Sequence, residues 1–230
     1  MRTIGIIGGI GPESTIDYYR LLIEAYRSRV ADGSYPSIVI NSIDVAKVLG
    51  FVANDLGALT AYLSREVQRL ADAGADFAAL AANTPHVVFG EVQRASSIPL
   101  VSIVRAAHDG AVRRGLTRLA LFGTRFTMGG SFYPDVFRDG TITLVPPRAD
   151  EQEFIHDKCV NELLQGEFLD ETRRQFERII VRLRDEERID GVILAGTELP
   201  LLLRTAAIEG VAMLDTTRLH VDAILDAFLR

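Results

Sequence analysis

Short runs of apolar, often β-branched residues alternate along this chain with longer stretches in which apolar residues recur every three or four positions. The short runs predict strands at residues 3–7, 37–42, 77–80, 100–102, 118–122, 141–145, 191–194 and 212–215. The longer stretches predict helices at residues 15–30, 56–73, 87–95, 105–114, 132–138, 150–164, 169–186 and 218–229. Strands that alternate with helices in this way are typical of parallel sheets with crossover helices. Most strands lack polar alternation, which indicates helices on both faces of each sheet. The pattern predicts an α/β fold.

A weak internal repeat suggests that the fold has two similar halves. The first predicted strand ends in Gly8-Gly9 and leads through Thr15 into a helix, and the fifth ends in Gly123 and leads through Thr127. Two strands therefore open onto similar polar turns. In open α/β folds, ligands bind at the carboxyl ends of such strands.

The repeat continues later in each half. Residues 80–86, Leu-Ala-Ala-Asn-Thr-Pro-His, are echoed by residues 194–200, Leu-Ala-Gly-Thr-Glu-Leu-Pro. Both segments are apolar strands that end in small residues, a threonine and a titratable group. We expect two α/β lobes, the first formed by residues 1–100 with 211–230 and the second by residues 101–210.

Composition narrows the class of protein. The 230 residues are 48% hydrophobic and 24% charged, an ordinary globular mixture that excludes disordered and low-complexity scaffolds. Because Cys159 is the only cysteine, an internal disulfide is excluded. The net charge of -6 argues against a general binder of nucleic acid or anionic membranes. No apolar run approaches the roughly 18 residues of a membrane span, and we expect a cytoplasmic protein.

The turn from Gly8 to Thr15 follows a predicted strand and precedes a predicted helix, so its backbone N–H groups can cradle an anion. The spacing of a dinucleotide fingerprint fails at Ser14, and no Walker lysine follows. A carboxylate is therefore favoured over a pyrophosphate, with Gly9 and Gly11 in the cradle. The alternative is a turn that only packs strand against helix, with Ser14 or Thr15 as the helix cap.

Two further turns carry titratable groups. Asn83 and Thr84 place an amide and a hydroxyl at a strand end, and His86 would lie in the first helical turn as a general acid or base. The alternative for His86 is an imidazole bonded to a backbone carbonyl or to solvent. In the second half, Glu198 can act as a base or bind a substrate amine, or it can simply stabilise a helix start. Further hydroxyls come from Thr124, Thr127 and Thr197.

The remaining histidines and the cysteine suggest no additional site. His108, His156 and His220 fall in helical stretches without the spacing of metal ligands, so we predict no metal. Cys159 lies near Lys158 and His156, which could lower the pKa of its thiol. Its helix is amphipathic, however, and we interpret Cys159 as a small core residue.

Taken together, the four turns resemble those of the aspartate/glutamate racemase superfamily. They are residues 8–15, residues 83–86, residues 122–124 with Thr127, and residues 197–200, and they occur in the family's order. The resemblance implies two pseudo-symmetric lobes with the active site in the cleft between them, no pyridoxal phosphate or other cofactor, and a homodimer. It also implies two cysteines that exchange the α-proton of an amino acid on opposite faces, beside a carboxylate cradle.

The sequence departs from that pattern where the two cysteines would stand, at Ala82 and Gly196. Neither a methyl group nor a hydrogen atom can accept a proton, so His86 and Glu198 are the titratable side chains left in the two motifs that would carry the cysteines. The resemblance implies a racemase-type isomerase that binds the α-carboxylate of a small amino acid. Its cradle would comprise Gly9, Gly11, Thr15, Asn83, Thr84, Thr124, Thr127 and Thr197. The alternatives are a noncatalytic carboxylate binder and a lyase or decarboxylase on the same fold.

Overall fold

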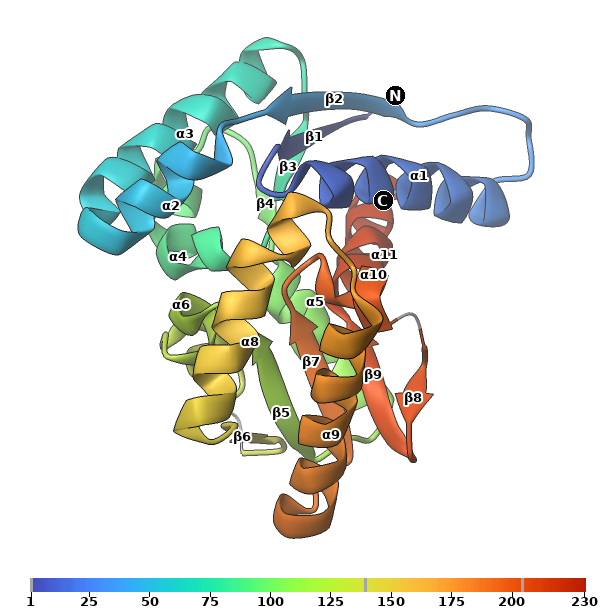
Figure 1. Cartoon of the computed structure of the whole chain (residues 1–230). Coiled ribbons are helices and arrows are strands. Elements are labelled where there is room, and N and C mark those ends of the chain that lie inside the picture. Colours follow the sequence, from blue (N-terminus) through green and yellow to red (C-terminus); the bar gives the residue numbers. More distant parts are fainter. Residues whose placement is uncertain (1, 139, 204) are drawn as a thin grey trace. The chain divides into compact units, whose positions relative to one another are not determined.

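The computed structural model describes residues 2–138, 140–203 and 205–230, and the chain divides into two compact units (Figure 1). Unit 1 comprises Met1–Ile103 with Thr217–Arg230, and unit 2 comprises Val104–Thr216. Each unit contains a sheet flanked by helices, which confirms the predicted α/β fold. Residues 211–216 were expected in the first lobe but belong to unit 2, because β9 (Val211–Asp215) pairs in parallel with β7 (Gly191–Ala195).

Unit 1 is built around a parallel sheet with the strand order β2-β1-β3-β4. Its strands are β1 (Thr3–Gly8), β2 (Ser37–Ser42), β3 (Phe77–Leu80) and β4 (Leu100–Val101). Its helices are α1 (Pro12–Arg29), α2 (Val45–Asn54), α3 (Leu56–Asp72), the 3-10 turn η1 (Thr84–Val88), α4 (Phe89–Ala95) and α11 (Thr216–Phe228).

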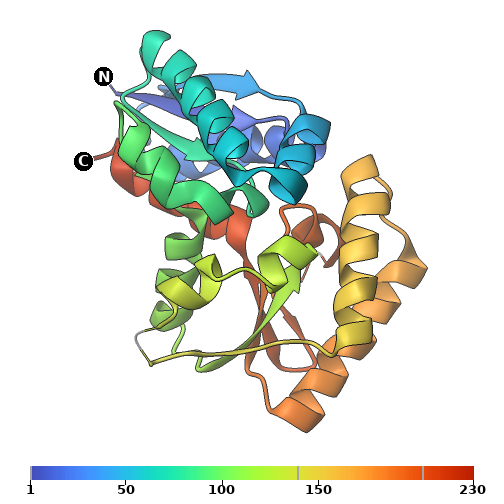
Figure 2. The same ribbon diagram turned by 90° about the vertical axis from the view of Figure 1, so that its left-hand side faces the viewer.

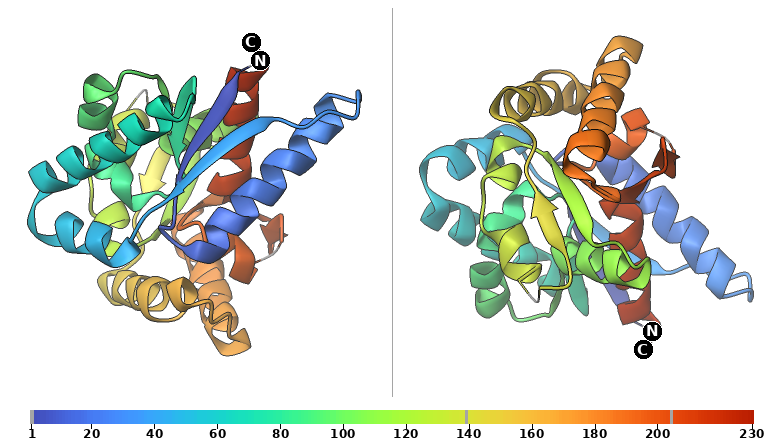
Figure 3. Two further views of the ribbon diagram at one scale, coloured as in Figure 1. Left: turned by 90° about the horizontal axis from the view of Figure 1, so that it is seen from above. Right: turned by 90° about the horizontal axis from the view of Figure 1, so that it is seen from below.

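Alternate residues of β1 point to opposite faces of this sheet. Ile4 and Ile6 belong to a buried cluster with residues of α1 and α11. On the other face, a Cβ built at Gly5 would lie 3.1 Å from Cδ1 of Leu70 in α3. Figure 3 shows α1 and α11 on one side of the strands and α3 on the other. Both faces are therefore covered, as the continuous apolar strands predict.

Unit 2 contains a five-stranded sheet with the order β6-β5-β7-β9-β8, parallel except for β8. The remaining strands are β5 (Arg118–Gly123), β6 (Thr143–Val145) and β8 (Ala207–Ile208). The helices are α5 (Ile103–Arg113), α6 (Arg125–Met128), α7 (Phe132–Val136), α8 (Ala149–Asn161), the 3-10 turn η2 (Leu163–Gln165), α9 (Asp170–Glu187) and α10 (Leu199–Leu203).

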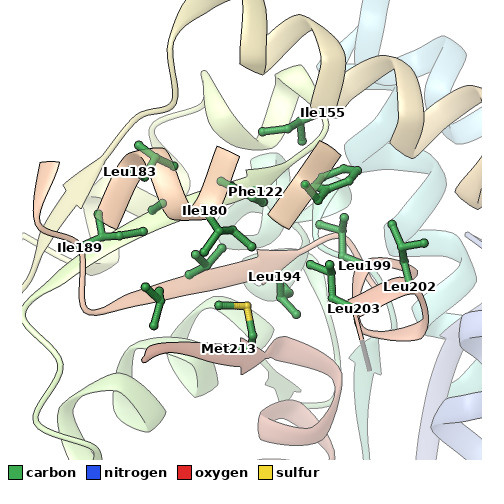
Figure 4. Close-up of a cluster of buried hydrophobic side chains, with 14 of the residues drawn as sticks. Phe122, Ile155, Ile180, Leu183, Ile189, Leu194, Leu199, Leu202, Leu203 and Met213 are labelled. Carbon is green, nitrogen blue, oxygen red and sulfur yellow. The ribbon is translucent and has the colours of Figure 1, made fainter. Parts of the chain in front are cut away.

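One face of this sheet carries a large apolar core. Phe122, Leu194 and Met213, from three neighbouring strands, share one buried cluster with Ile155 of α8 and Ile180 of α9 (Figure 4). Figure 2 shows α8 and α9, coloured yellow to orange, together on one side of the strands. Burial of each such side chain stabilises the fold by about 1.5–3 kcal/mol.

The two sheets share a strand order, which gives the sequence repeat a structural counterpart. The first strand of each unit, β1 or β5, lies between the second and the third, and a further strand, β4 or β9, extends the sheet beyond the third. All of these pairings are parallel. The carboxyl ends of β1 and β3 therefore lie side by side in unit 1, as those of β5 and β7 do in unit 2.

Several local boundaries differ from the prediction. Helix α2 was not predicted, although Asp44 marks its start by accepting hydrogen bonds from the N–H groups of Ala46 and Lys47. Helix α1 begins at Pro12 rather than at Thr15, since proline suits the first helical position. The predicted helix at 87–95 is divided into η1 and α4. Among the described residues, no helix is long and apolar enough to cross a membrane.

Candidate functional site

The turn after β1 is held in shape by Gly9 and Thr15. Gly9 has a φ of 80°, and a Cβ built on it would lie 2.2 Å from the carbonyl oxygen of Ile43, so only glycine fits. The Gly9 N–H donates to Oγ1 of Thr15 at 2.8 Å, and that hydroxyl donates to the Gly11 carbonyl at 3.2 Å. Both groups that sequence analysis assigned to ligand contact therefore bond within the turn and fix its path.

The same turn leads into the positive end of a long helix dipole. Gly11 precedes α1 with a φ of 97° and has no side chain to cap it, and Pro12 occupies the first helical position. An 18-residue helix concentrates partial positive charge at this end, which attracts anions. The exposed Glu13 in the first turn benefits from the same field.

The turn after β3 is buried and polar. Ala82, Asn83 and Thr84 are all buried, and the Ala81 N–H donates to the Ile7 carbonyl at 2.9 Å, which ties this turn to β1. The carbonyl of Asn83 accepts the N–H of His86 at 2.9 Å at the start of η1. The predicted amide and hydroxyl thus lie at the end of β3, next to the glycine turn.

His86 is engaged by the main chain at both ring nitrogens. Its Nδ1 lies 2.9 Å from the Ala82 carbonyl oxygen and donates to it, so Nε2 accepts the N–H of Ile103 at 3.2 Å. The ring stacks on Phe89 at a centroid distance of 4.8 Å. Burial, and then the neighbouring His220, lowers the pKa of His86 to about 3. This geometry matches the alternative of a neutral imidazole bonded to a backbone carbonyl.

His220 of α11 is the second buried imidazole in unit 1. Its Nε2 lies 3.0 Å from the Val101 carbonyl oxygen, which can only accept, so Nε2 is protonated and Nδ1 accepts the Tyr18 hydroxyl at 2.8 Å. Burial lowers the pKa of His220 to about 4. This neutral ring therefore connects α11, α1 and β4.

The turn after β5 repeats the packing of the turn after β1. A Cβ built at Gly123 would lie 3.1 Å from Cγ2 of Thr127, and one built at Gly8 would lie 2.5 Å from Cγ2 of Thr15. In both units, a strand-ending glycine makes room for the methyl group of a helical threonine. The hydroxyls of Thr124 and Thr127 lie 3.3 Å apart and are buried.

The turn after β7 contains Glu198, the buried carboxylate of the four motifs, which lies next to Thr197. The Thr197 hydroxyl donates to Oε2 of Glu198 at 3.2 Å. A Cβ built at Gly196 would lie 3.3 Å from Cδ1 of Leu199, the flexible end of a side chain, and 3.8 Å from Sγ of Cys159. The fold therefore accepts a side chain at position 196, unlike at Gly9.

Helix α8 contributes two groups that sequence analysis did not assign to the site. Cys159 belongs to the apolar core, as predicted, but its thiol also borders position 196. Burial, reinforced by the charge of Glu198, raises the pKa of this thiol. His156 accepts the Arg125 N–H at 3.3 Å, and desolvation lowers its pKa. The sequence feature that could have pointed to both is the spacing of three residues between His156 and Cys159, which places the two side chains on one side of a helix.

Comparison with known proteins places this arrangement in a family. The model of the Asp/Glu/Hydantoin racemase family matches residues 7–224, nearly the whole chain. This chain belongs to that family. The racemase resemblance drawn from the four turns is thereby confirmed. Among the described residues of this family member, no group of three or more His, Cys, Asp or Glu side chains could hold a metal ion.

Individual relatives agree with the family assignment. The chain is 27% identical over 218 residues to a broad-specificity amino-acid racemase of Bacillus subtilis (strain 168), covering 87% of each chain. It is 34% identical to an aspartate racemase homologue from Pyrococcus horikoshii OT3, with full coverage of both chains and a TM-score of 0.84. An aspartate racemase of Picrophilus torridus, 19% identical, shares the fold with a TM-score of 0.78 over 99% of this chain and 94% of its own.

Proposed function

We propose that this racemase-family chain is a cofactor-independent isomerase that removes and returns the α-proton of a small amino acid. The observation that carries the proposal is the retention of buried polar turns at the carboxyl ends of β1, β3, β5 and β7. The substrate α-carboxylate would bind at the start of α1 and at the buried hydroxyls and amide. The proposed contacts are Gly11, Asn83, Thr84, Thr124, Thr127 and Thr197, whereas Gly9 and Thr15 hold the turn after β1 in shape.

Abstraction of a weakly acidic α-proton needs a nearby base, a donor on the opposite face and stabilisation of the developing charge on the carboxylate. In unit 2, we assign the base or acid to Glu198, which the Thr197 hydroxyl orients. In unit 1, the nitrogens of His86 are occupied, so we assign it the positioning of the turn that carries Asn83 and Thr84.

Proton NMR in deuterated buffer tests the proposal directly, because loss of an α-proton signal reports abstraction whatever the product. The natural chain should exchange the α-proton of at least one member of a broad amino-acid panel. Glu198→Gln keeps the size of the side chain but removes the titratable group, and should abolish exchange. Absence of exchange by the natural chain across the panel would overturn the proposal.

A matched variant restores thiols at the two strand ends. Ala82→Cys and Gly196→Cys should be combined with Cys159→Ala, since position 196 is close enough to Cys159 for an unwanted disulfide. If only this variant exchanges the α-proton, the carboxylate-binding turns are intact and the natural chain does not use them for proton transfer.

A noncatalytic carboxylate-binding protein is the second candidate. It is favoured by the lack of a proton acceptor at Ala82 and Gly196 and by the backbone-bonded state of His86. Calorimetry of the natural chain with the same amino acids would then show saturable binding without exchange. Detection of turnover would remove this candidate.

A further inference from the structure

Helix α8 contacts the turns that follow two neighbouring strands of unit 2. The imidazole of His156 accepts the N–H of Arg125, the second residue after the end of β5, at 3.3 Å. Three residues further along α8, Sγ of Cys159 lies 3.8 Å from a Cβ built at Gly196, the residue that follows β7. Side chains three residues apart share one side of a helix, so His156 lies on the side of α8 that meets both polar turns.

The bond from Arg125 fixes which nitrogen of this ring carries the proton. A backbone N–H only donates, so Nδ1 of His156 is the acceptor and carries no proton. The proton of the neutral ring is therefore on Nε2. This Nε2 forms no hydrogen bond with any residue that the structure describes, and the side chain is partly exposed. His156 thus presents an unused N–H donor, whereas both ring nitrogens of His86 are bonded.

The surroundings of His156 keep its ring neutral and in place. Partial burial, and then the positive charge of Arg125, lowers the pKa of His156 against a weaker opposing effect of Asp157. The Phe126 ring meets the imidazole edge-on at a centroid distance of 6.3 Å, and the Arg125 guanidinium lies 5.1 Å from the centroid of the same Phe126 ring. Arg125 is exposed and forms no ion pair within the described part of the chain, so its charge favours an anion at this turn.

The same bonding excludes the neutral His156 ring as a base. A base needs a free lone pair, but the lone pair of Nδ1 is bound by the Arg125 N–H, and Nε2 already holds its proton. His156 is therefore equipped to donate a hydrogen bond, and Glu198 remains the proton acceptor assigned in unit 2.

We propose that His156 is a further catalytic residue, whose neutral Nε2–H donates a hydrogen bond to the substrate carboxylate while the α-proton is removed. This inference rests on the proposed isomerase function. As the proton moves from the α-carbon to the Glu198 carboxylate, the electron pair of the broken C–H bond moves into the substrate carboxylate. Negative charge grows on the carboxylate oxygens, so a fixed N–H donor binds this state more strongly than the starting amino acid. A neutral imidazole can act in this way without giving up its proton.

Exchange of the α-proton in deuterated buffer, measured with variants of the full chain, tests the role of the donor. His156→Phe keeps a flat ring but removes the N–H, and should lower kcat at least about tenfold with a much smaller change in KM, because the donor acts on the developing charge. His156→Gln offers an amide N–H near the position of Nε2 and should recover part of the loss. His108→Phe makes the same change on α5, outside the four turns, and should leave exchange unchanged. Circular dichroism verifies that each variant is folded.

NMR of the natural chain labelled with nitrogen-15 histidine supplies a readout other than activity. At neutral pH, His156 should carry a proton on Nε2 and none on Nδ1, and the spectrum of His156→Gln identifies its resonances by their absence. Addition of the pooled amino-acid panel should displace the Nε2 resonance of His156, because the N–H then donates to a bound carboxylate.

The outcomes separate this inference from the isomerase proposal. Exchange by His156→Phe at the natural rate would overturn the role of His156 and leave the isomerase proposal standing. So would a proton on Nδ1, or a folded His156→Gln variant no faster than His156→Phe. Absence of exchange by the natural chain would overturn the isomerase proposal, and a displaced Nε2 resonance would then still support donation to a bound carboxylate. An Nε2 resonance that the panel leaves unmoved overturns the contact in either case.

Discussion

Gly9→Ala should destabilise unit 1 through two separable effects. Alanine at a φ of 80° carries a left-handed backbone penalty of about 1–2 kcal/mol. Its Cβ would also lie 2.2 Å from the Ile43 carbonyl oxygen and 2.6 Å from the Ile43 nitrogen, which are backbone atoms that cannot rotate away. The resulting shift adds about 1–3 kcal/mol, by analogy with overpacked cores. Urea denaturation should therefore show a loss of roughly 2–5 kcal/mol in the free energy of unfolding.

Gly33→Ala is the matched control for the backbone penalty alone. Gly33 has a φ of 81°, and a Cβ built there meets nothing within 4 Å. The difference between the two variants therefore isolates the collision with Ile43. Equal losses in the free energy of unfolding would show that the turn moves aside freely, and would refute the conclusion that the fold requires glycine at position 9. A change in the denaturant m value would instead indicate an altered denatured or native state.

Three further outcomes follow from the buried polar groups. The pKa values of His86 and His220 in the folded chain, about 3 and about 4, lie below the ordinary histidine value of 6.5. The unfolded chain therefore binds more protons than the folded chain as the pH falls below 6.5. The contribution of the two neutral rings to the free energy of unfolding should therefore be fully present above about pH 6.5 and should decline toward about pH 4. The loss should be roughly 3 kcal/mol for His220 alone, and urea midpoints measured across this range test it. Tyr18→Phe leaves Nδ1 of His220 without its donor and should cost about 1–3 kcal/mol in urea denaturation, whereas a loss near zero would contradict the assigned bond. The buried Cys159 thiol, whose pKa is raised, should resist a thiol-reactive dye in the native chain and react fully in denaturant, and rapid native labelling would contradict its burial.

The sequence predicted the order of strands and helices because the spacing of apolar residues in each kind of element follows from its local backbone geometry. A strand buried on both faces must be apolar throughout, as in β3. A surface helix must have one apolar and one polar face, as in α3. The four polar turns and the family resemblance were also visible, since a short segment of small and polar residues with a threonine follows the end of each of these strands. Helix α2 was missed although Asp44 and the apolar run after it carry the signal of a capped helix.

The roles of the titratable groups required the tertiary structure. The sequence left His86 open between a general acid or base and an imidazole bonded to the backbone. In the structure its ring nitrogens bond to Ala82 and to Ile103, which is 17 residues away. Cys159 resembled a core residue and is one, yet its thiol borders position 196, which lies 37 positions further along the chain and belongs to another element.

The sequence by itself therefore determined the fold class, the family and the turns, because periodicity, turn residues and motif spacing are local properties of the chain. Tertiary structure decided which glycine is indispensable and which imidazole is already bonded. It also decided which apolar side chains of α1 remain exposed after Tyr18 and Leu22 are buried. Such properties depend on atoms that only folding brings within a few ångströms. The pattern of one segment cannot specify them, because the backbone groups and side chains that complete each contact come from distant positions.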